Sequence, residues 1–381
     1  MRIQNLEFIN FTLFEGLKID FSPRINVIIG ENGTGKTQLL KAAYAMAWEQ
    51  NNHKKNQSGS KIPFPTKLVR LFRPLDSQLI QLIRQGRAQK AFLSATFEDE
   101  SSINYSLNKK REPLIKVLYG GFKQTTEAQP IFIPTKEILS LLSGLRSPEV
   151  DTKTIELLFD DTYLDLAEIL CKEPNINKKD LIDFDPRFGE TYLKLVQAIG
   201  GIYNFKNNRF FFRPGQYSEQ LKVDNRKLNS NSVEDESYFV SDKVYTVFEP
   251  IKNSEISTSM TAEGFRKIGI LQQLLNNRSL NPGISGPLFW DEPESNMNPK
   301  LMRMLVESLL LLSRQRQQII LATHDYVFLK WLDLLKDIKQ EDHIRFHVLY
   351  RDDESKNIKI KSTDNYLEIE PNAIASSFND L

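Results

Sequence analysis

The sequence predicts an α/β fold: a mixed, mostly parallel sheet with flanking helices, interrupted by an inserted lobe that is mainly helical. Two observations lead to this prediction. The run from Ile25 to Ile29 is β-branched and apolar on both faces, which is typical of a central strand in a parallel sheet. After Thr261 the pattern alternates between helix and strand, with strands at 288–290 and 319–322 around a helix at 299–312.

The N-terminal third is expected to contribute short strands and one long helix. The helix follows the central strand over residues 36–50, with apolar residues at helical spacing from Leu39 to Met46. Residues 51–60 are polar and are expected to form a loop. Apolar patterning predicts the strands of this part at 3–9, 17–21, 25–29, 91–97, 103–107, 115–119 and 131–133.

The middle of the chain breaks this pattern. Residues 136–199 have helical periodicity, and residues 216–237 are polar with almost no apolar period, so we predict a loop there. The predicted organisation is therefore an N-terminal half of the core, a helical insertion with a polar loop, and a C-terminal half of the core. Their limits are 1–135, 136–240 and 241–381.

Composition and charge narrow the class of protein. The 381 residues are 40% apolar and 26% charged, with a net charge of +1, so any basic surface must be local. The single cysteine, Cys171, excludes an intrachain disulfide framework and fits a reducing compartment. We find no signal peptide and no apolar run near the eighteen or so residues of a membrane span, and we expect a cytoplasmic protein without a membrane partner.

A glycine-rich motif follows the central strand. Residues 30–37, GENGTGKT, match G-x-x-x-x-G-K-[ST], in which glycines let backbone N–H groups point at phosphates. Lys36 would reach the β- and γ-phosphates, and the Thr37 hydroxyl would take a position on Mg²⁺. The residues expected to hold ATP here are Asn32, Gly33, Thr34, Gly35, Lys36 and Thr37.

Two further strand ends carry candidate catalytic residues. Asp291 and Glu292 follow the apolar strand 288–290, so Asp291 would hold Mg²⁺, usually through water, and Glu292 would orient and deprotonate the attacking water. His324 follows the strand 319–322, where it could hydrogen-bond a γ-phosphate.

Together these segments resemble the ABC-class ATPases, specifically the SMC and RecF-like heads and the related bacterial "overcoming lysogenization defect" branch. The resemblance rests on Asn10-Phe11, GENGTGKT, WDEPESNMNPK and ATHD, which occur in that family's order and span about two-thirds of the chain. It implies ATP hydrolysis by a homodimer, or a higher homo-oligomer, with nucleotide at the subunit interface.

The resemblance also implies a signature segment that contacts the other subunit's γ-phosphate. The matching stretch runs from Met260 to Lys267, and a helix start there would present N–H groups to phosphate. The alternative is a plain helix N-cap at Thr261. Ser295 to Asn298 match the D-loop, whereas no residue of 134–137 matches the expected Q-loop glutamine. The residues implied to bind the partner's ATP are Thr261, Ala262, Glu263 and Gly264.

Two charged segments have less specific interpretations. Residues 53–90 could track a phosphate backbone, although a solvated face or a docking surface for an acidic protein explains them almost as well. Their basic residues are Lys54, Lys55, Lys61, Lys67, Arg70, Arg73, Arg84, Arg87 and Lys90. A second, acidic cluster could hold a metal, but we predict a solvated helix face; it comprises Asp160, Asp161, Asp165 and Glu168.

The leading functional hypothesis is an ATP-driven switch that couples nucleotide state to DNA or to a partner protein, with phage defence or DNA repair as the settings implied by the resemblance. Only 57 residues follow His324, so a nuclease or toxin activity is expected on a separate effector subunit. The alternatives are a small-molecule P-loop kinase or GTPase, which needs no signature segment, and the ATPase subunit of a transporter.

Overall fold

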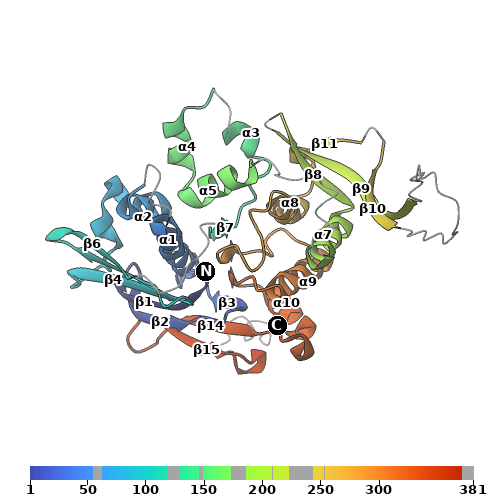
Figure 1. Ribbon diagram of the computed structural model, residues 1–381. Helices are drawn as coiled ribbons and strands as arrows, with labels where there is room; N and C mark the ends of the chain where they lie inside the picture. The colour runs from blue at the N-terminus through green and yellow to red at the C-terminus, as the bar shows by residue number, and fades with distance from the viewer. Residues whose placement is uncertain are drawn as a thin grey trace, which may run out of the picture.

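The structure is a computed structural model. Its centre is a six-stranded mixed sheet (Figure 1). The strand order is β15-β14-β3-β13-β12-β7, parallel except for β15. The strands are β3 (Ile25–Gly30), β7 (Ile131–Ile133), β12 (Leu288–Asp291), β13 (Ile319–Thr323), β14 (Ile344–Arg351) and β15 (Ile358–Thr363). The described residues are 1–54, 62–118, 129–145, 149–172, 186–207, 209–222, 243–252 and 254–370.

The central strand β3 is buried along its whole length, as its sequence predicts. Alternate residues of the sheet enter two separate cores, because successive side chains of a strand point to opposite faces. Ile28 and Phe289 face a core shared with α1 (Lys36–Lys54), whereas Val27 and Trp290 face one shared with α8 (Glu263–Asn276) and α9 (Pro299–Arg314).

A second, antiparallel sheet packs beside the first and covers α1 together with it (Figure 1). Its order is β2-β1-β4-β5-β6, so β1 is an inner strand paired on both edges. The strands are β1 (Ile3–Phe11), β2 (Phe14–Asp20), β4 (Lys90–Phe97), β5 (Ser102–Asn108) and β6 (Arg111–Leu118). The N-terminal strands predicted from the sequence are confirmed, each within a few residues.

The remaining helices flank the sheets, and several begin at recognisable caps. Asn298 caps α9 and Asp325 caps α10 (Tyr326–Leu335), so both helices that follow the sites at β12 and β13 have a defined start. The other helices are α2 (Phe64–Phe72), α3 (Leu142–Leu145), α4 (Thr152–Leu158), α5 (Asp161–Leu170) and α7 (Pro186–Ile199), with short 3-10 turns at 75–77, 79–82, 258–260, 338–340 and 366–368. None of the helices among the described residues is long and apolar enough to cross a bilayer.

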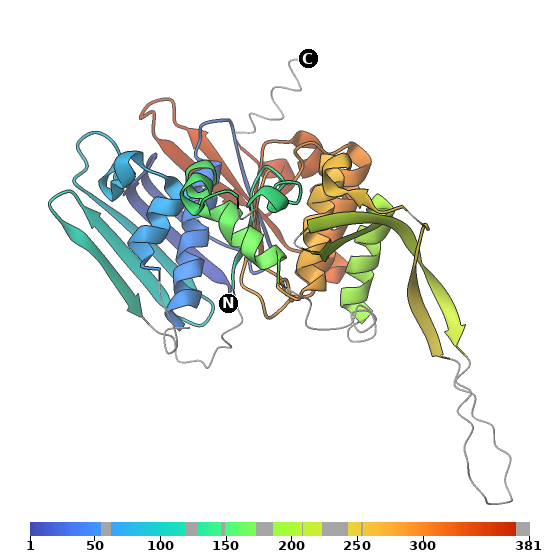
Figure 2. The same cartoon turned by 90° about the horizontal axis from the view of Figure 1, so that it is seen from above.

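The inserted lobe contains a β-arm as well as helices. β9 (Arg209–Lys222) pairs with β8 (Gly201–Lys206), β10 (Lys243–Pro250) and β11 (Ile256–Ser257), and the β9–β10 hairpin projects from the body (Figure 2). The predicted loop at 216–237 is therefore wrong at its start, because 216–222 pair with β10, and the rest of that range lies outside the described residues. The domain limits stay a prediction.

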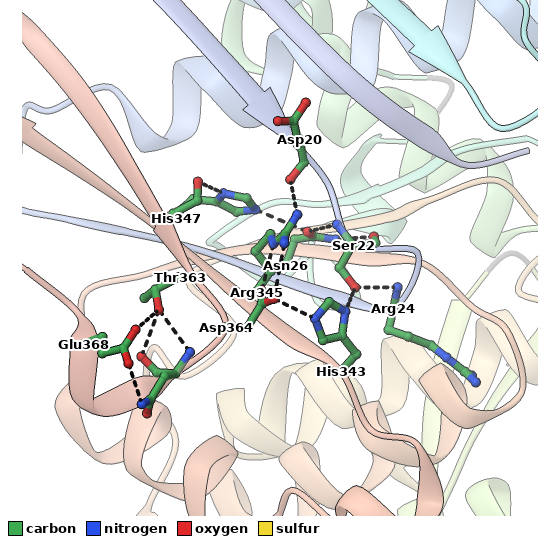
Figure 3. Close-up of polar contacts among 12 residues, drawn as sticks. Asp20, Ser22, Arg24, Asn26, His343, Arg345, His347, Thr363, Asp364 and Glu368 are labelled. Carbon is green, nitrogen blue, oxygen red and sulfur yellow. Dashed lines mark hydrogen bonds and ion pairs between the residues drawn. The ribbon is translucent and has the colours of Figure 1, made fainter.

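A polar cluster joins β3, β14 and β15 at the end of these strands opposite the glycine-rich motif, and Figure 3 shows its side chains. Ser22 Oγ lies 2.7 Å from His343 Nδ1, and His343 Nε2 lies 3.2 Å from Asp364. This order resembles a Ser–His–Asp triad, but Ser22 is 1% exposed and Arg345 makes two hydrogen bonds to Asp364. We interpret the cluster as a structural tie between the strands.

Candidate functional site

The glycine-rich motif forms a loop between β3 and α1. Gly33 and Gly35 have φ values of +81° and +93°, which a glycine adopts without strain, and Gly30 lies so close to the Leu349 carbonyl oxygen that a Cβ would be 2.6 Å away. Lys36 donates to the carbonyl oxygens of Gly30 at 2.7 Å and Glu31 at 3.1 Å. Burial lowers the pKa of Lys36, although nearby carboxylates oppose the shift. The loop therefore combines a largely buried ammonium group, that of Lys36, with a tight glycine-rich backbone of the kind that can surround phosphates.

Asp291 and Thr37 meet at the start of α1. The Thr37 hydroxyl donates to Asp291 Oδ2 at 2.8 Å, and the Thr135 hydroxyl donates to the same oxygen at 3.1 Å. The other oxygen, Oδ1, is buried without a hydrogen-bond partner among the described residues, and burial raises the pKa of Asp291. A hydroxyl and a buried carboxylate with a spare oxygen are the hard ligands that Mg²⁺ prefers, so these residues fit the ion.

One ring nitrogen of His324 faces two carboxylates of the turn after β12. Its Nδ1 is 3.0 Å from Glu292 Oε1 and 3.9 Å from Glu294 Oε1. Glu292 has a φ of +47°, an uncommon backbone conformation for a residue with a side chain. Both candidate catalytic residues of the sequence therefore lie together, with their side chains partly exposed.

Glu294 is a member of the site that sequence reasoning missed. Its side chain is 4% exposed, Oε1 accepts a hydrogen bond from the Thr323 hydroxyl at 2.6 Å, and Oε2 is buried with no partner among the described residues. Burial raises the pKa of Glu294 to about 7. The only sequence signal was its position three residues after Asp291, which by itself does not separate a buried acid from a solvated one.

The start of α8 differs from the N-cap alternative considered for Thr261. The N-cap is Ala262, which has no side-chain hydrogen bond to the helix, and the Thr261 hydroxyl instead contacts Thr258 O and Tyr203 OH at 2.7 and 2.6 Å. Ala262 is exposed while Gly264 is buried. This helix start thus lacks a capping side chain.

Gly264 is held against the D-loop. A Cβ on Gly264 would lie 2.9 Å from Leu301 Cδ2 and 3.2 Å from the Asn296 carbonyl oxygen. Asn296 is exposed and has a φ of +61°. The signature segment and the D-loop therefore form one packed unit, in which even a methyl group at Gly264 would require a shift.

The segment after β7, where a Q-loop glutamine was expected, makes two other contacts. Thr135 reaches Asp291, as described above, and Glu137 forms an ion pair of 2.7 Å with Arg266 of α8. Both Glu137 and Arg266 are largely buried. The residues that the sequence left without a role thus connect the end of β7 to Asp291 and to the signature helix.

The acidic cluster is not a solvated helix face, so that prediction is wrong. Lys67 is fully buried and contacts Asp161 at 2.8 Å and Asp165 at 2.6 Å, and Lys41 of α1 contacts Asp160 at 2.6 Å. Only Glu168 is exposed. The metal interpretation also gains no support, since the described residues contain no group of three or more His, Cys, Asp or Glu side chains arranged to hold a metal ion. The cluster instead ties α5 to α1 and α2.

The basic segment 53–90 is partly used inside the protein. Lys67 is buried, Arg70 pairs with Glu156 at 3.3 Å, and Arg84 donates to Asn357 at 2.6 Å. Arg73 donates to the Leu157 carbonyl oxygen. Arg87 and Lys90 are exposed, whereas Lys55 and Lys61 lie outside the described residues, as does the side chain of Lys54. Lys67 therefore cannot contribute to a basic surface, and contact of the segment with nucleic acid stays a prediction.

Comparison with known proteins identifies a family over the part of the chain that holds these motifs. A family model described as "AAA domain, putative AbiEii toxin, Type IV TA system" matches residues 25–330, which include every site residue described above. The chain belongs to this family. It is accordingly an ABC-type P-loop protein of an ATP-binding family, and the resemblance stated from the motifs is confirmed at that level.

Parts of the chain are also similar to curated DNA replication and repair proteins. The chain is 26% identical over 231 residues to the DNA replication and repair protein RecF of Pediococcus pentosaceus, covering 58% of this chain and 56% of that protein. It is 39% identical over 159 residues to RecF of Lactobacillus gasseri, covering 42% and 37%. The chain thus spans about half, or less, of the length of the curated relatives it matches.

The fold is that of SMC and RecF-like ABC-ATPase heads. A crystal structure of an SMC head bound to the C-winged helix domain of ScpA matches with a TM-score of 0.56 at 13% identity, over 97% of this chain and 100% of that one. At that identity the match concerns the fold alone. The predicted fold class is confirmed.

Proposed function

We propose that this AAA-domain protein binds ATP with Mg²⁺ and hydrolyses it as one half of a homodimer, or within a larger homo-oligomer. The observation that carries the proposal is the 2.8 Å hydrogen bond from Thr37 to Asp291, whose second oxygen is buried and has no partner among the described residues. Thr37 belongs to the phosphate loop and Asp291 to the end of β12, so two segments far apart in the sequence would together hold Mg²⁺.

Each proposed role follows from the chemistry of the side chain. Mg²⁺ would neutralise charge on the β- and γ-phosphates. Lys36 supplies a cation beside the loop N–H groups, and Glu292 is placed to accept a proton from the attacking water. His324, held by the carboxylates next to it, presents its other ring nitrogen for a hydrogen bond to the γ-phosphate.

The start of α8 supports the dimeric form of the proposal. Ala262 is exposed and gives the helix no side-chain cap, so its first N–H groups and the positive end of its dipole suit an anion. In the proposed dimer, that anion is the γ-phosphate held by the partner's phosphate loop, contacted by the segment from Thr261 to Gly264.

Two variants test binding and hydrolysis separately. Lys36→Ala should lose ATP affinity, because the phosphates lose the cation that the loop provides. Glu292→Gln should keep ATP bound while hydrolysis slows by about 10²–10⁴-fold, because the water loses its base. Nucleotide binding and phosphate release are measured for both. Equal hydrolysis rates for Glu292→Gln and the parent would remove Glu292 from this role.

A matched pair at Ala262 tests the contact between subunits. Ala262→Asp and Ala262→Asn both supply a good N-cap, so both should keep α8 folded. Only the aspartate places a negative charge against the partner's γ-phosphate. In the Glu292→Gln background with ATP, the asparagine variant should dimerise and the aspartate variant should not, as measured by sedimentation velocity at several concentrations. Dimerisation of both variants to the same extent would contradict the contact.

The output of the switch is proposed to be DNA or a separate effector protein, in phage defence or DNA repair. The family description names a toxin of a toxin–antitoxin system, and the RecF relatives act, by their name, in DNA replication and repair. Arg87 and Lys90, which are exposed, are the described residues of the basic segment best placed to contact nucleic acid. Co-purification of the parent with the product of a neighbouring gene, compared with Lys36→Ala, tests the effector.

A further inference from the structure

A buried lysine on α8 contacts the turn that carries Glu292. Lys267 is 0% exposed, and its ammonium group donates to the Glu292 carbonyl oxygen at 3.2 Å and to the Ser295 hydroxyl. Lys267 lies five residues after Ala262, within the first two turns of the helix whose start is proposed to bind the partner's phosphate. One side chain therefore connects the signature helix to the catalytic turn.

The surroundings of Lys267 do not suit a purely structural residue. Among the described residues, no carboxylate lies within ion-pair distance of its ammonium group, and both hydrogen bonds go to neutral oxygens. Burial lowers the pKa of Lys267 to about 8, although the carboxylates of Glu263, Glu294, Glu292 and Asp291 oppose the shift. An apolar side chain of similar length would fill the same space without the cost of desolvating a charge.

The main chain that Lys267 contacts is in an unusual conformation. Glu292 has a φ of +47°, a backbone region that costs energy for a residue with a side chain and persists where its surroundings hold it. The Ser295 hydroxyl lies 3.1 Å from the Glu292 carbonyl oxygen and 3.4 Å from that of Thr135. Lys267 and Ser295, which are hydrogen-bonded to each other, thus both contact the Glu292 carbonyl oxygen.

A neighbouring residue connects the same helix start to the end of β7. Arg266 forms the 2.7 Å ion pair with Glu137 and also donates to the Thr261 carbonyl oxygen. Displacement of the first turn of α8 would therefore act on the Thr135–Glu137 segment through Arg266 and on Glu292 through Lys267.

We propose that Lys267 is a positioning residue that holds Glu292 in its catalytic conformation and couples this conformation to the phosphate contact made by the start of α8. The coupling follows from the dimer, in which α8 of one subunit contacts the partner's nucleotide while Glu292 serves the nucleotide of its own subunit. Binding at one composite site is thereby transmitted to the catalytic residue of the other. The inference rests on the proposed function.

The test is a double-mutant cycle between Lys267 and Glu292. Lys267→Met should lower kcat about 10²-fold, the size of effect that a misplaced catalytic group produces, while the affinity for a non-hydrolysable ATP analogue stays within about twofold. Lys267→Gln keeps an N–H donor for the Glu292 carbonyl and should recover part of the rate. In the Glu292→Gln background, Lys267→Met should cost nothing further, because the carboxylate that it positions is already removed.

Three outcomes overturn the inference without touching the proposed function. They are an unchanged kcat in Lys267→Met, an equal loss of rate in both backgrounds, and a loss of analogue affinity as large as the loss of kcat. Melting curves of each variant identify a folding defect, and Ser295→Ala, which removes the second contact to the same carbonyl, should then lower kcat in a variant that keeps Lys267. If the parent does not hydrolyse ATP, the proposed function itself is wrong, and this outcome is distinct from the three above.

Discussion

Replacing Glu294 by glutamine should alter how the stability of the protein depends on pH. The carboxyl group is 4% exposed, and burial raises its pKa from 4.5 to about 7. The folded protein therefore holds a proton on Glu294 between about pH 4.5 and 7 that the unfolded chain has released. Because the folded state binds more protons in this window, the free energy of unfolding contributed by Glu294 falls as the pH rises through it.

The magnitude follows from the two pKa values. Linkage between a folded-state pKa of about 7 and an unfolded-state value of 4.5 gives a loss of about 2.5 kcal/mol between roughly pH 5 and pH 8. Glutamine has no such ionisation. The difference in free energy of unfolding, variant minus parent, should therefore rise by about 2.5 kcal/mol from roughly pH 5 to pH 8. Its value at pH 5 contains the cost of burying an amide instead of a neutral carboxyl group, which cancels in this comparison.

Urea unfolding at pH 5, 6, 7 and 8, without nucleotide and with a chelator present, measures the effect. Glu354→Gln, which removes an exposed carboxylate, is the matched control. A difference between Glu294→Gln and the parent that stays constant over this range would refute the reasoning. In that case Glu294 would be ionised in the folded protein at pH 5, despite its burial.

The remaining predictions concern packing and charge. Lys67→Met leaves the buried Asp161 and the partly buried Asp165 without their cation and should cost about 3–5 kcal/mol in urea unfolding. Gly269→Ala places a Cβ 2.3 Å from the Tyr203 ring, so it should lose about 1–3 kcal/mol although alanine favours helix. If the protein binds duplex DNA, reversing Arg87 and Lys90 to Glu should weaken binding, and the parent should weaken with salt by about −0.9 in log–log slope per phosphate contacted. Parent binding that is insensitive to salt would exclude this contact.

The phosphate loop and its strand could be predicted because their signals are local. Residues 25–37 combine a run of β-branched residues with glycines at fixed spacing, and both features act through the backbone of the segment itself. The ends of β12 and β13 were predicted for the same reason, since Asp291 and His324 each follow an apolar run. The parallel pairing of β12 with β13 brings these two ends side by side.

The β-arm shows where local signals fail. Residues 216–222 are mostly polar, so their periodicity favours a loop, yet they form strand through pairing with 243–249. The hydrogen-bond partners of this segment lie more than twenty residues away in the sequence, and no pattern within 216–222 predicts them.

The sequence by itself determined the fold class, the glycine-rich loop, and which residues end the strands around it, because apolar periodicity and glycine conformations belong to short segments. Only the tertiary structure decided which charged residues are buried. Lys67 contacts Asp161 and Asp165, which lie nearly a hundred residues later in the sequence. Lys267 of α8 contacts the carbonyl oxygen of Glu292, which lies in the turn after β12. Burying a charged group costs free energy that depends on the groups around it, and those groups are set by how distant elements pack.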